Sequence, residues 1–129
     1  MAKKRCLSVD VFESESFLKL TKNSRILYVG LLLHADDDGI VENCLSVMRL
    51  LVASKKQINE LENAGFLIKF ENVYVIKHWH RHNQIPPSKK EPSMYNEVLK
   101  NLIINGKKEY ELKRENAKTP TNPSLISAE

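Results

Sequence analysis

The residues best suited to chemistry in this chain are basic and amide side chains between positions 55 and 63. Lys55 and Lys56 carry positive charge, and Gln57, Asn59 and Asn63 carry amides that donate and accept hydrogen bonds. Lysine binds phosphate, and side-chain amides hydrogen-bond to base edges. The pattern therefore predicts a surface that contacts nucleic acid. An ordinary solvated helix face is the competing interpretation, and two glutamates in the same segment favour it.

Three histidines at alternating positions, His78, His80 and His82, are the second group suited to chemistry. In a continuing strand their side chains would share one face, which is compatible with zinc binding. However, no cysteine lies nearby, and a flexible segment after a hairpin is a poor frame for a tetrahedral site. We therefore expect no metal here, but a basic surface that includes Arg81 and contacts phosphate or solvent.

Three consecutive aspartates followed by a glycine, at 36–39, suggest a cation-binding loop by composition alone. A calcium loop alternates its ligands and ends in a glutamate, and neither feature occurs at the required offsets. Acidic residues are unfavourable at a helix C-terminus. This segment therefore predicts the end of a helix near Ala35 and a turn at Gly39.

The sequence contains no arrangement of residues typical of an enzyme. Cys6 and Cys44 have no base or orienting group at a recognisable spacing. A glycine-rich phosphate loop and a serine–histidine–aspartate pattern are also missing from the sequence. We therefore expect neither catalysis nor a cofactor.

The predicted elements have an order that would position these side chains. Apolar spacing and capping residues predict helices over 22–35, 44–52 and 55–64. A short strand at 40–41 follows the first helix, and a β-hairpin with strands at 66–70 and 73–78 follows the third. This is the order of a winged helix-turn-helix, an α+β fold in which three helices carry a hairpin as the wing.

In such a fold the third helix follows the second after a tight turn and projects from the body. A helix fits the major groove of DNA, and the hairpin reaches the adjacent backbone. We therefore expect the polar face of 55–64 to enter the groove. Further DNA contacts are expected from a basic N-terminal arm and from basic residues after the hairpin: Lys3, Lys4, Arg5, Lys77, Arg81, Lys89 and Lys90.

The C-terminal quarter of the chain is expected to add little to this domain, which spans 1–95. Residues 96–112 are predicted to extend it as a helix or strand, and the polar residues 113–129 to form a disordered tail. Apolar residues at helical spacing within 94–105 predict a face that pairs with another chain, made of Tyr95, Val98 and Leu102. The alternative for this region is one or two short strands, at 102–104 and 110–112.

Length and charge are compatible with one DNA-binding domain. The chain has 129 residues, a net charge of +4 and an isoelectric point near 9.1. Basic and acidic residues balance through residue 50, so the whole excess lies beyond it. No apolar run approaches the roughly 18 residues of a membrane span, and no signal-peptide core follows the basic N-terminus. With two widely spaced cysteines, these features predict a reducing intracellular location and no membrane partner.

Four segments of the sequence resemble a known protein family. They are MAKKRCLSVDVFESESFLKL, YVGLLLHADDDGIVEN, MRLLVAS and VYVIKHWHRHNQIPPSK, which together fall within residues 1–95. These segments look like the N-terminal domain of phage replisome organiser proteins of low-GC Gram-positive hosts, a family related to the DnaD-type primosome proteins. The resemblance includes the Ala-Asp-Asp-Asp-Gly segment and the Val-Ile-Lys-His-Trp end of the hairpin.

The resemblance implies a winged-helix domain that acts in phage-type DNA replication initiation, in the cytoplasm of the bacterial host and near the nucleoid. It implies that the protein binds origin DNA as a duplex, organises the replisome and recruits the replicative helicase or its loader. Family members carry a further C-terminal region for helicase contact or oligomerisation, and 34 residues follow position 95 here. The alternatives are a winged-helix transcriptional regulator and a module for self-association as a homodimer or higher oligomer.

Overall fold

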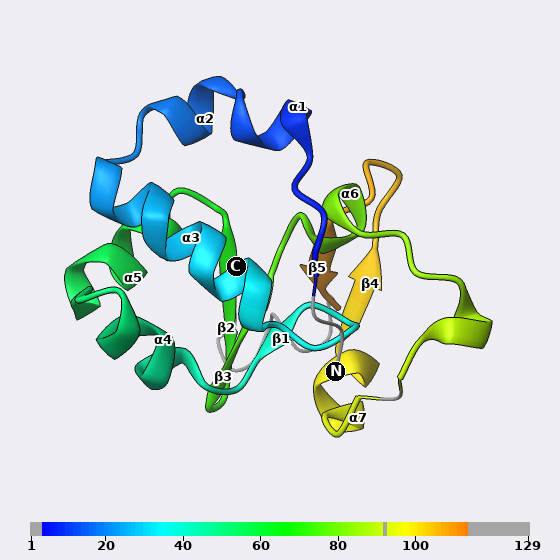
Figure 1. The fold of residues 1–129 in the computed structure, drawn as a ribbon. Coiled ribbons are helices and arrows are strands. Elements are labelled where there is room, and N and C mark those ends of the chain that lie inside the picture. Colours follow the sequence, from blue (N-terminus) through cyan, green and yellow to red (C-terminus); the bar gives the residue numbers. More distant parts are fainter. Residues whose placement is uncertain (1–3, 92, 114–129) are drawn as a thin grey trace, which may run out of the picture.

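The computed structural model describes residues 4–91 and 93–113, and the chain is a mixed α+β fold (Figure 1). In chain order its elements are α1 (Val9–Phe12), α2 (Glu15–Leu18), α3 (Lys22–His34), β1 (Ile40–Val41), α4 (Cys44–Leu50), α5 (Lys55–Asn63), β2 (Leu67–Phe70), β3 (Val73–Ile76), α6 (Trp79–His82), the 3₁₀ turn η1 (Pro87–Lys89), α7 (Asn96–Lys100), β4 (Leu102–Ile104) and β5 (Tyr110–Leu112). The helices and the hairpin predicted between residues 22 and 76 therefore occur in the expected order.

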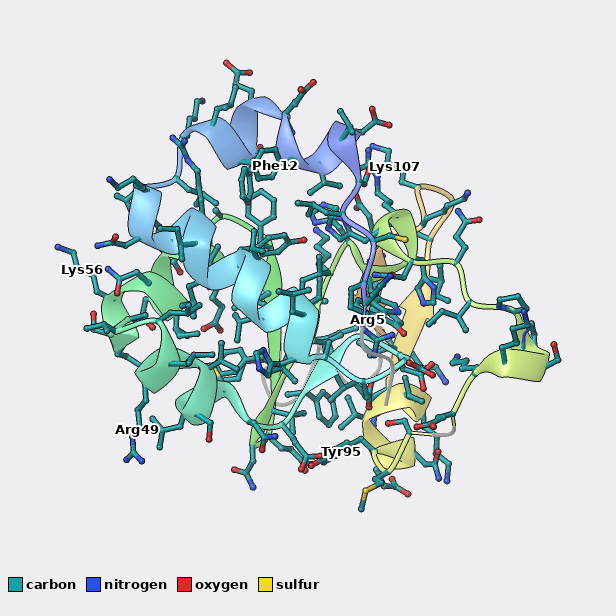
Figure 2. The ribbon with its side chains drawn as sticks, in the orientation of Figure 1. Arg5, Phe12, Arg49, Lys56, Tyr95 and Lys107 are labelled. Atoms are coloured by element: carbon teal, nitrogen blue, oxygen red, sulfur yellow. The ribbon has the colours of Figure 1, made fainter. Side chains whose placement is uncertain are left out.

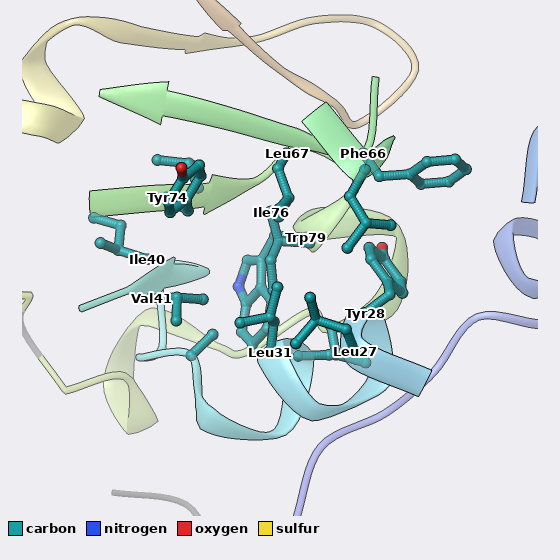
Figure 3. Close-up of a cluster of buried hydrophobic side chains, with 14 of the residues drawn as sticks. Leu27, Tyr28, Leu31, Ile40, Val41, Phe66, Leu67, Tyr74, Ile76 and Trp79 are labelled. Carbon is teal, nitrogen blue, oxygen red and sulfur yellow. The ribbon is translucent and has the colours of Figure 1, made fainter. Parts of the chain in front are cut away.

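The strands form two small antiparallel sheets. β3 is the middle strand of the first sheet, with β1 on one side and β2 on the other, so that Ile40 and Ile68 both lie opposite Val75. β4 and β5 form a separate two-stranded sheet. α3 packs against α4 and α5, and α5 also contacts β2 (Figure 1). The core forms where α3 meets the first sheet, around Tyr28, Leu31 and Trp79 (Figure 3).

Local sequence signals explain the boundaries of α5. Its first turn is capped because the side-chain oxygen of Gln57 accepts the backbone N–H of Ser54 at 2.8 Å. Its apolar positions, Ile58 and Leu61, are both buried. The helix is followed by Gly65 at φ +86°, a conformation that glycine adopts without strain.

The chain after β3 departs from the prediction of a continuing strand. β3 ends at Ile76, and Trp79–His82 form one helical turn, α6. This turn places the indole of Trp79 in the core at 1% exposure, where its N–H donates to the backbone oxygen of Asp37 at 3.1 Å. The three histidines therefore do not share a face, and the described residues contain no group of side chains suited to a metal.

His82 is a buried hydrogen-bonded residue, and the prediction of a phosphate-contacting histidine surface is wrong for it. The backbone N–H of Ser8 donates to its Nδ1 at 2.8 Å, and its Nε2 lies 2.7 Å from the hydroxyl of Tyr28. Since Nδ1 accepts, the proton of the neutral ring is on Nε2 and is donated to Tyr28. The side chain therefore ties the N-terminal segment to α3.

Acid is expected to destabilise the fold through His82. Burial, with smaller contributions from His78 and Arg81, lowers the pKa of His82 to about 4, whereas an unfolded histidine titrates near 6.5. The neutral ring therefore stabilises the fold fully above pH 6.5, and this stability is lost as the pH falls toward 4. The loss is at most about 1.4 kcal/mol per pH unit for one proton.

Urea denaturation at pH 7.5 and pH 5 measures this effect on the free energy of unfolding. The wild type should be less stable at pH 5, and His82→Gln should show a shallower dependence. His34→Gln, which removes an exposed imidazole, is the control and should keep the wild-type profile. Equal stability of the wild type at both pH values would contradict the expectation.

The segment 94–105 is not the single helix predicted from its periodicity. α7 ends at Lys100, and the chain continues as β4, which pairs with β5, so that the strand alternative is confirmed. Val98 and Leu102 are 5% and 7% exposed because they pack within the core of this chain. The apolar face predicted for pairing with a second chain is thus already covered. Of the tail predicted for 113–129, all but Lys113 lies outside the described residues.

The aspartate segment 36–38, after α3, forms hydrogen bonds with several parts of the chain. The Asp36 carboxylate accepts the backbone N–H groups of Asp38 and Ile40 and the hydroxyl of Ser93. The backbone oxygen of Asp38 accepts the hydroxyl of Tyr110 at 2.7 Å. The segment therefore ends the helix, as predicted, and also joins α3 to the C-terminal residues.

Gly39→Ala is expected to reduce the free energy of unfolding by about 2 kcal/mol. Gly39 has φ +84°, and a Cβ atom there would lie 2.5 Å from Cγ of the buried Trp79. Chemical denaturation gives the measurement. Gly106→Ala is the matched control because nothing lies within 4 Å of its Cβ position, and it should change stability by less than about 0.5 kcal/mol. Equal effects of the two substitutions would contradict this expectation.

Among the described residues, no helix has the length and apolar character required to traverse a bilayer.

Candidate nucleic-acid interface

The polar side of α5 presents four of its five predicted contact residues to solvent. Lys55, Lys56, Asn59 and Asn63 are exposed, and Figure 2 shows Lys56 pointing away from the body of the molecule. Gln57 is partly buried and serves the capping interaction with Ser54. The helix therefore offers two ammonium groups and two amides, while Gln57 is occupied by a structural role.

The carboxylate of Glu60 would repel phosphate, but in the structure it accepts hydrogen bonds from residues at the start of α3. The carboxylate accepts the backbone N–H of Thr21 at 3.0 Å, the hydroxyl of Thr21 at 2.7 Å and the hydroxyl of Ser24. Hydrogen bonds from Ser24 and Thr21 lower the pKa of this carboxyl. The negative charge thus stabilises the N-terminus of α3, where the helix dipole favours an anion.

A hollow of about 610 Å³ runs along the exposed side of α5. Both walls contribute polar groups, with α5 on one side and the α2–α3 region on the other, and we call it the α5 groove. It is lined by Ser16, Lys19, Leu20, Lys56, Asn59, Glu60, Asn63 and Ala64. Two lysines and two amides therefore face one open depression.

A second hollow of about 310 Å³ continues from the C-terminal end of α5, and we call it the Arg81 hollow. Its lining includes two basic residues on the exit from β3, Lys77 and Arg81, together with Val11, Ser14, Ser16, Ala64, Gly65, Phe66, His78 and Glu109. Ser16 and Ala64 line both depressions. The two hollows are therefore neighbours, and the structure brings Lys56, Asn59 and Asn63 into one surface with Lys77 and Arg81.

The Arg81 hollow contains one carboxylate, from the turn before β5. Oε2 of Glu109 lies 3.5 Å from Nη1 of Arg81 and 3.4 Å from Nε2 of His78. Burial lowers the pKa of His78, and Glu109 partly opposes that shift. At neutral pH the fixed charges of the hollow are therefore two cations, Lys77 and Arg81, against one anion.

Arg5 does not belong to an exposed basic arm. Its side chain is 2% exposed, and its guanidinium donates to Asp37 at 2.8 Å and to the backbone oxygen of Ala35 at 2.7 Å. The same group lies 5.1 Å from the ring centre of Trp79, a cation–π distance. The guanidinium is engaged within the fold, which contradicts the prediction that Arg5 belongs to an exposed basic arm.

The remaining predicted residues are not part of the joined hollows. Lys4 is exposed on the N-terminal segment, and Lys3 lies outside the described residues. Lys89 and Lys90 lie on and beside η1, across the molecule from α5 (Figure 1). Lys90 also forms an ion pair with Asp38. The structure therefore separates the lysines after the hairpin from the α5 face.

Sequence reasoning missed Lys19 and Ser16 as members of this surface. Both precede α3, about 40 positions from the α5 side chains that they face. No periodicity links them to α5, because only the packing of α3 against α5 brings the two segments together. Glu109 was missed for the same reason, since it reaches Arg81 through the β4–β5 hairpin.

Comparison with protein-family models, with curated proteins and with solved structures found no match for this chain.

Proposed function

We propose that this chain is a winged-helix protein that binds duplex DNA. In this proposal α3, α4 and α5 are the three helices, β1 pairs with the hairpin, and the β2–β3 hairpin is the wing. The exposed polar side of α5 supports the assignment of this helix to the major groove. An α-helix with its side chains is about 10–12 Å in diameter, so α5 fits a major groove that is about 12 Å wide.

The observation that carries the proposal is the run of positive charge along the joined hollows. Lys19 and Lys56 line the α5 groove, and Lys77 and Arg81 line the Arg81 hollow. Two carboxylates, Glu60 and Glu109, line the same surface, so its four cations leave a net charge of +2 that favours a DNA backbone. Asn59 and Asn63 lie between them on α5, where their amides are available to base edges.

The wing is expected to contribute less than the α5 side of the molecule. Glu71 and Asn72 form the tip of the hairpin, and Lys69 is the exposed basic residue nearest to it. A carboxylate at the tip repels phosphate. Backbone contacts in this proposal therefore come from the joined hollows along α5 and not from the wing.

The proposed role is origin binding and replisome organisation in phage-type replication initiation, with recruitment of the replicative helicase or its loader. This assignment is supported by the sequence resemblance over residues 1–95. A transcriptional regulator of the same fold would bind DNA through the same surface, since fold does not fix function. Footprinting on the source genome separates the two, because protection of a replication origin supports our assignment and protection of promoters alone contradicts it.

A gel shift with duplex DNA at about 50 mM salt tests DNA binding itself. Several phosphate contacts should give strong binding at this ionic strength. Lys55→Glu combined with Lys56→Glu should weaken the shifted complex. Failure of the wild-type chain to shift any duplex at this salt concentration would contradict the proposal.

Self-association is the second candidate, and apolar residues on and after α4 favour it. Leu45, Leu50 and Val52 are 62%, 67% and 92% exposed. Val52 also has φ +53°, an uncommon conformation for a β-branched residue. Light scattering of the full chain tests self-association, because it gives the molar mass in solution. A wild-type monomer at high concentration would exclude it, and a dimer that Leu50→Lys dissociates would support it.

A further inference from the structure

The position of Glu109 in the Arg81 hollow is fixed by the backbone of its hairpin. The backbone N–H of Tyr110 donates to the oxygen of Lys77 at 2.9 Å, which joins β5 to the exit from β3. The backbone N–H of Glu109 donates to the side-chain oxygen of Asn105 at 3.0 Å. These bonds hold the Glu109 carboxylate beside Arg81, although the two residues are 28 positions apart.

The contacts of the Glu109 carboxylate are longer than charge-assisted hydrogen bonds usually are. Charge-assisted N–H···O bonds measure about 2.7–2.9 Å, whereas Glu109 lies 3.5 Å from Arg81 and 3.4 Å from His78. The Arg81 side chain is 33% exposed, so water competes for its guanidinium. One carboxylate, 15% exposed and with two long contacts, therefore shares this hollow with two cations, Arg81 and Lys77.

A phosphate group suits this hollow better than a carboxylate does. Arginine binds phosphate with two parallel hydrogen bonds, and a lysine ammonium adds charge and donors. The exposed Ser16 lies on the boundary with the α5 groove, and a hydroxyl is a common donor to DNA phosphates. The hollow adjoins the end of α5, where a DNA backbone would pass in the proposed mode of binding.

We propose that the Arg81 hollow receives one phosphate group of the DNA backbone, and that Glu109 occupies its cationic end in the free protein as an intramolecular competitor. This inference rests on the proposed DNA binding. It adds that Glu109 weakens the affinity for DNA. When DNA binds, the Glu109 side chain turns out to solvent and Arg81 and Lys77 contact the phosphate. The β4–β5 hairpin thereby sets the affinity of the α5 surface.

Glu109→Gln should tighten binding to duplex DNA about three- to tenfold at 50–100 mM salt, because Arg81 no longer has a competing anion. The slope of log K against log salt should stay the same, because Arg81 and Lys77 contact the same phosphate in both complexes. Glu97→Gln is the matched control. It removes the same charge from a side chain that is 82% exposed and paired with Lys100 on α7. The control should leave the affinity for duplex DNA close to that of the wild type.

A double-mutant cycle with Arg81→Gln shows whether the effect passes through the hollow. Arg81→Gln should weaken binding more in the Glu109→Gln background than in the wild type, because only there is Arg81 free of its competitor. Circular dichroism verifies folding, and Glu109→Ala is used instead if Glu109→Gln is unfolded. Inorganic phosphate that replaces chloride at equal ionic strength should weaken DNA binding by Glu109→Gln more than by the Glu109→Gln/Arg81→Gln double variant, because free phosphate competes for Arg81. Equal weakening of the two variants would contradict the assignment of a phosphate to this hollow.

The outcomes separate this inference from the proposed function. If the wild type binds DNA but Glu109→Gln and Glu97→Gln behave alike, the inference is wrong and DNA binding stands. If neither the wild type nor Glu109→Gln binds duplex at 50 mM salt, both are wrong. If only Glu109→Gln binds, the competition by Glu109 is supported directly.

Discussion

Trp79→Ala is expected to reduce the free energy of unfolding by about 3–5 kcal/mol. The indole is 1% exposed in the core between α3 and the first sheet (Figure 3). Its removal leaves a cavity, deprives the backbone oxygen of Asp37 of a donor and takes the ring from beneath Arg5. Since small domains are stable by about 5–15 kcal/mol, this change is a large part of the total.

Urea denaturation followed by far-UV circular dichroism measures this loss, because Trp79 is the single tryptophan and fluorescence is lost with it. Trp79→Phe fills part of the cavity and should cost less than Trp79→Ala. Leu50→Ala is the control on an exposed side chain and should change stability by less than about 0.5 kcal/mol. A cost below about 1 kcal/mol for Trp79→Ala would show that the indole is not central to the fold.

Reversing two charges in the joined hollows, Lys56→Glu with Lys77→Glu, is expected to weaken duplex binding about 100-fold at low salt. Each substitution removes one phosphate contact and places a carboxylate beside the backbone, and we assign about tenfold to each. Lys56 lines the α5 groove and Lys77 lines the Arg81 hollow, so the pair samples both parts of the surface. Fluorescence anisotropy with a labelled duplex gives the two affinities.

The matched control reverses two lysines away from the hollows, Lys89 on η1 and Lys100 on α7. Lys89→Glu with Lys100→Glu changes the net charge by the same amount, from +4 to 0. Both lysines are exposed, and Lys100 pairs with Glu97. The control should lose less than about fivefold, which is the general effect of net charge. Equal losses in the two double variants would show that binding has no preference for the α5 surface.

The sequence predicts those helices and strands that are determined by interactions between nearby residues. The helix over 22–34 follows from a continuous apolar face, and the β2–β3 hairpin follows from two β-branched runs across two residues. The capping interaction of Ser54 with Gln57 was visible as a four-residue pattern. These interactions link positions at most a few residues apart, which is why a single sequence reveals them.

The sequence does not predict the burial or pairing of side chains whose partners lie far away along the chain. Arg5 is a surface cation by type, and its burial follows only from the position of Asp37 and Trp79. His82 is a basic surface residue in the same sense until Ser8 and Tyr28 enclose it. The DNA-binding prediction was affected in the same way, because basic residue type alone does not tell a guanidinium in an ion pair from a free one.

The salt dependence of duplex binding tests the central claim most directly. Four cations line the joined hollows, Lys19, Lys56, Lys77 and Arg81. Each neutralised phosphate contributes about −0.9 to the slope of log K against log salt, so a slope of about −4 is predicted for the wild type. A slope between 0 and about −1, or no binding at 50 mM salt, would contradict DNA binding through this surface.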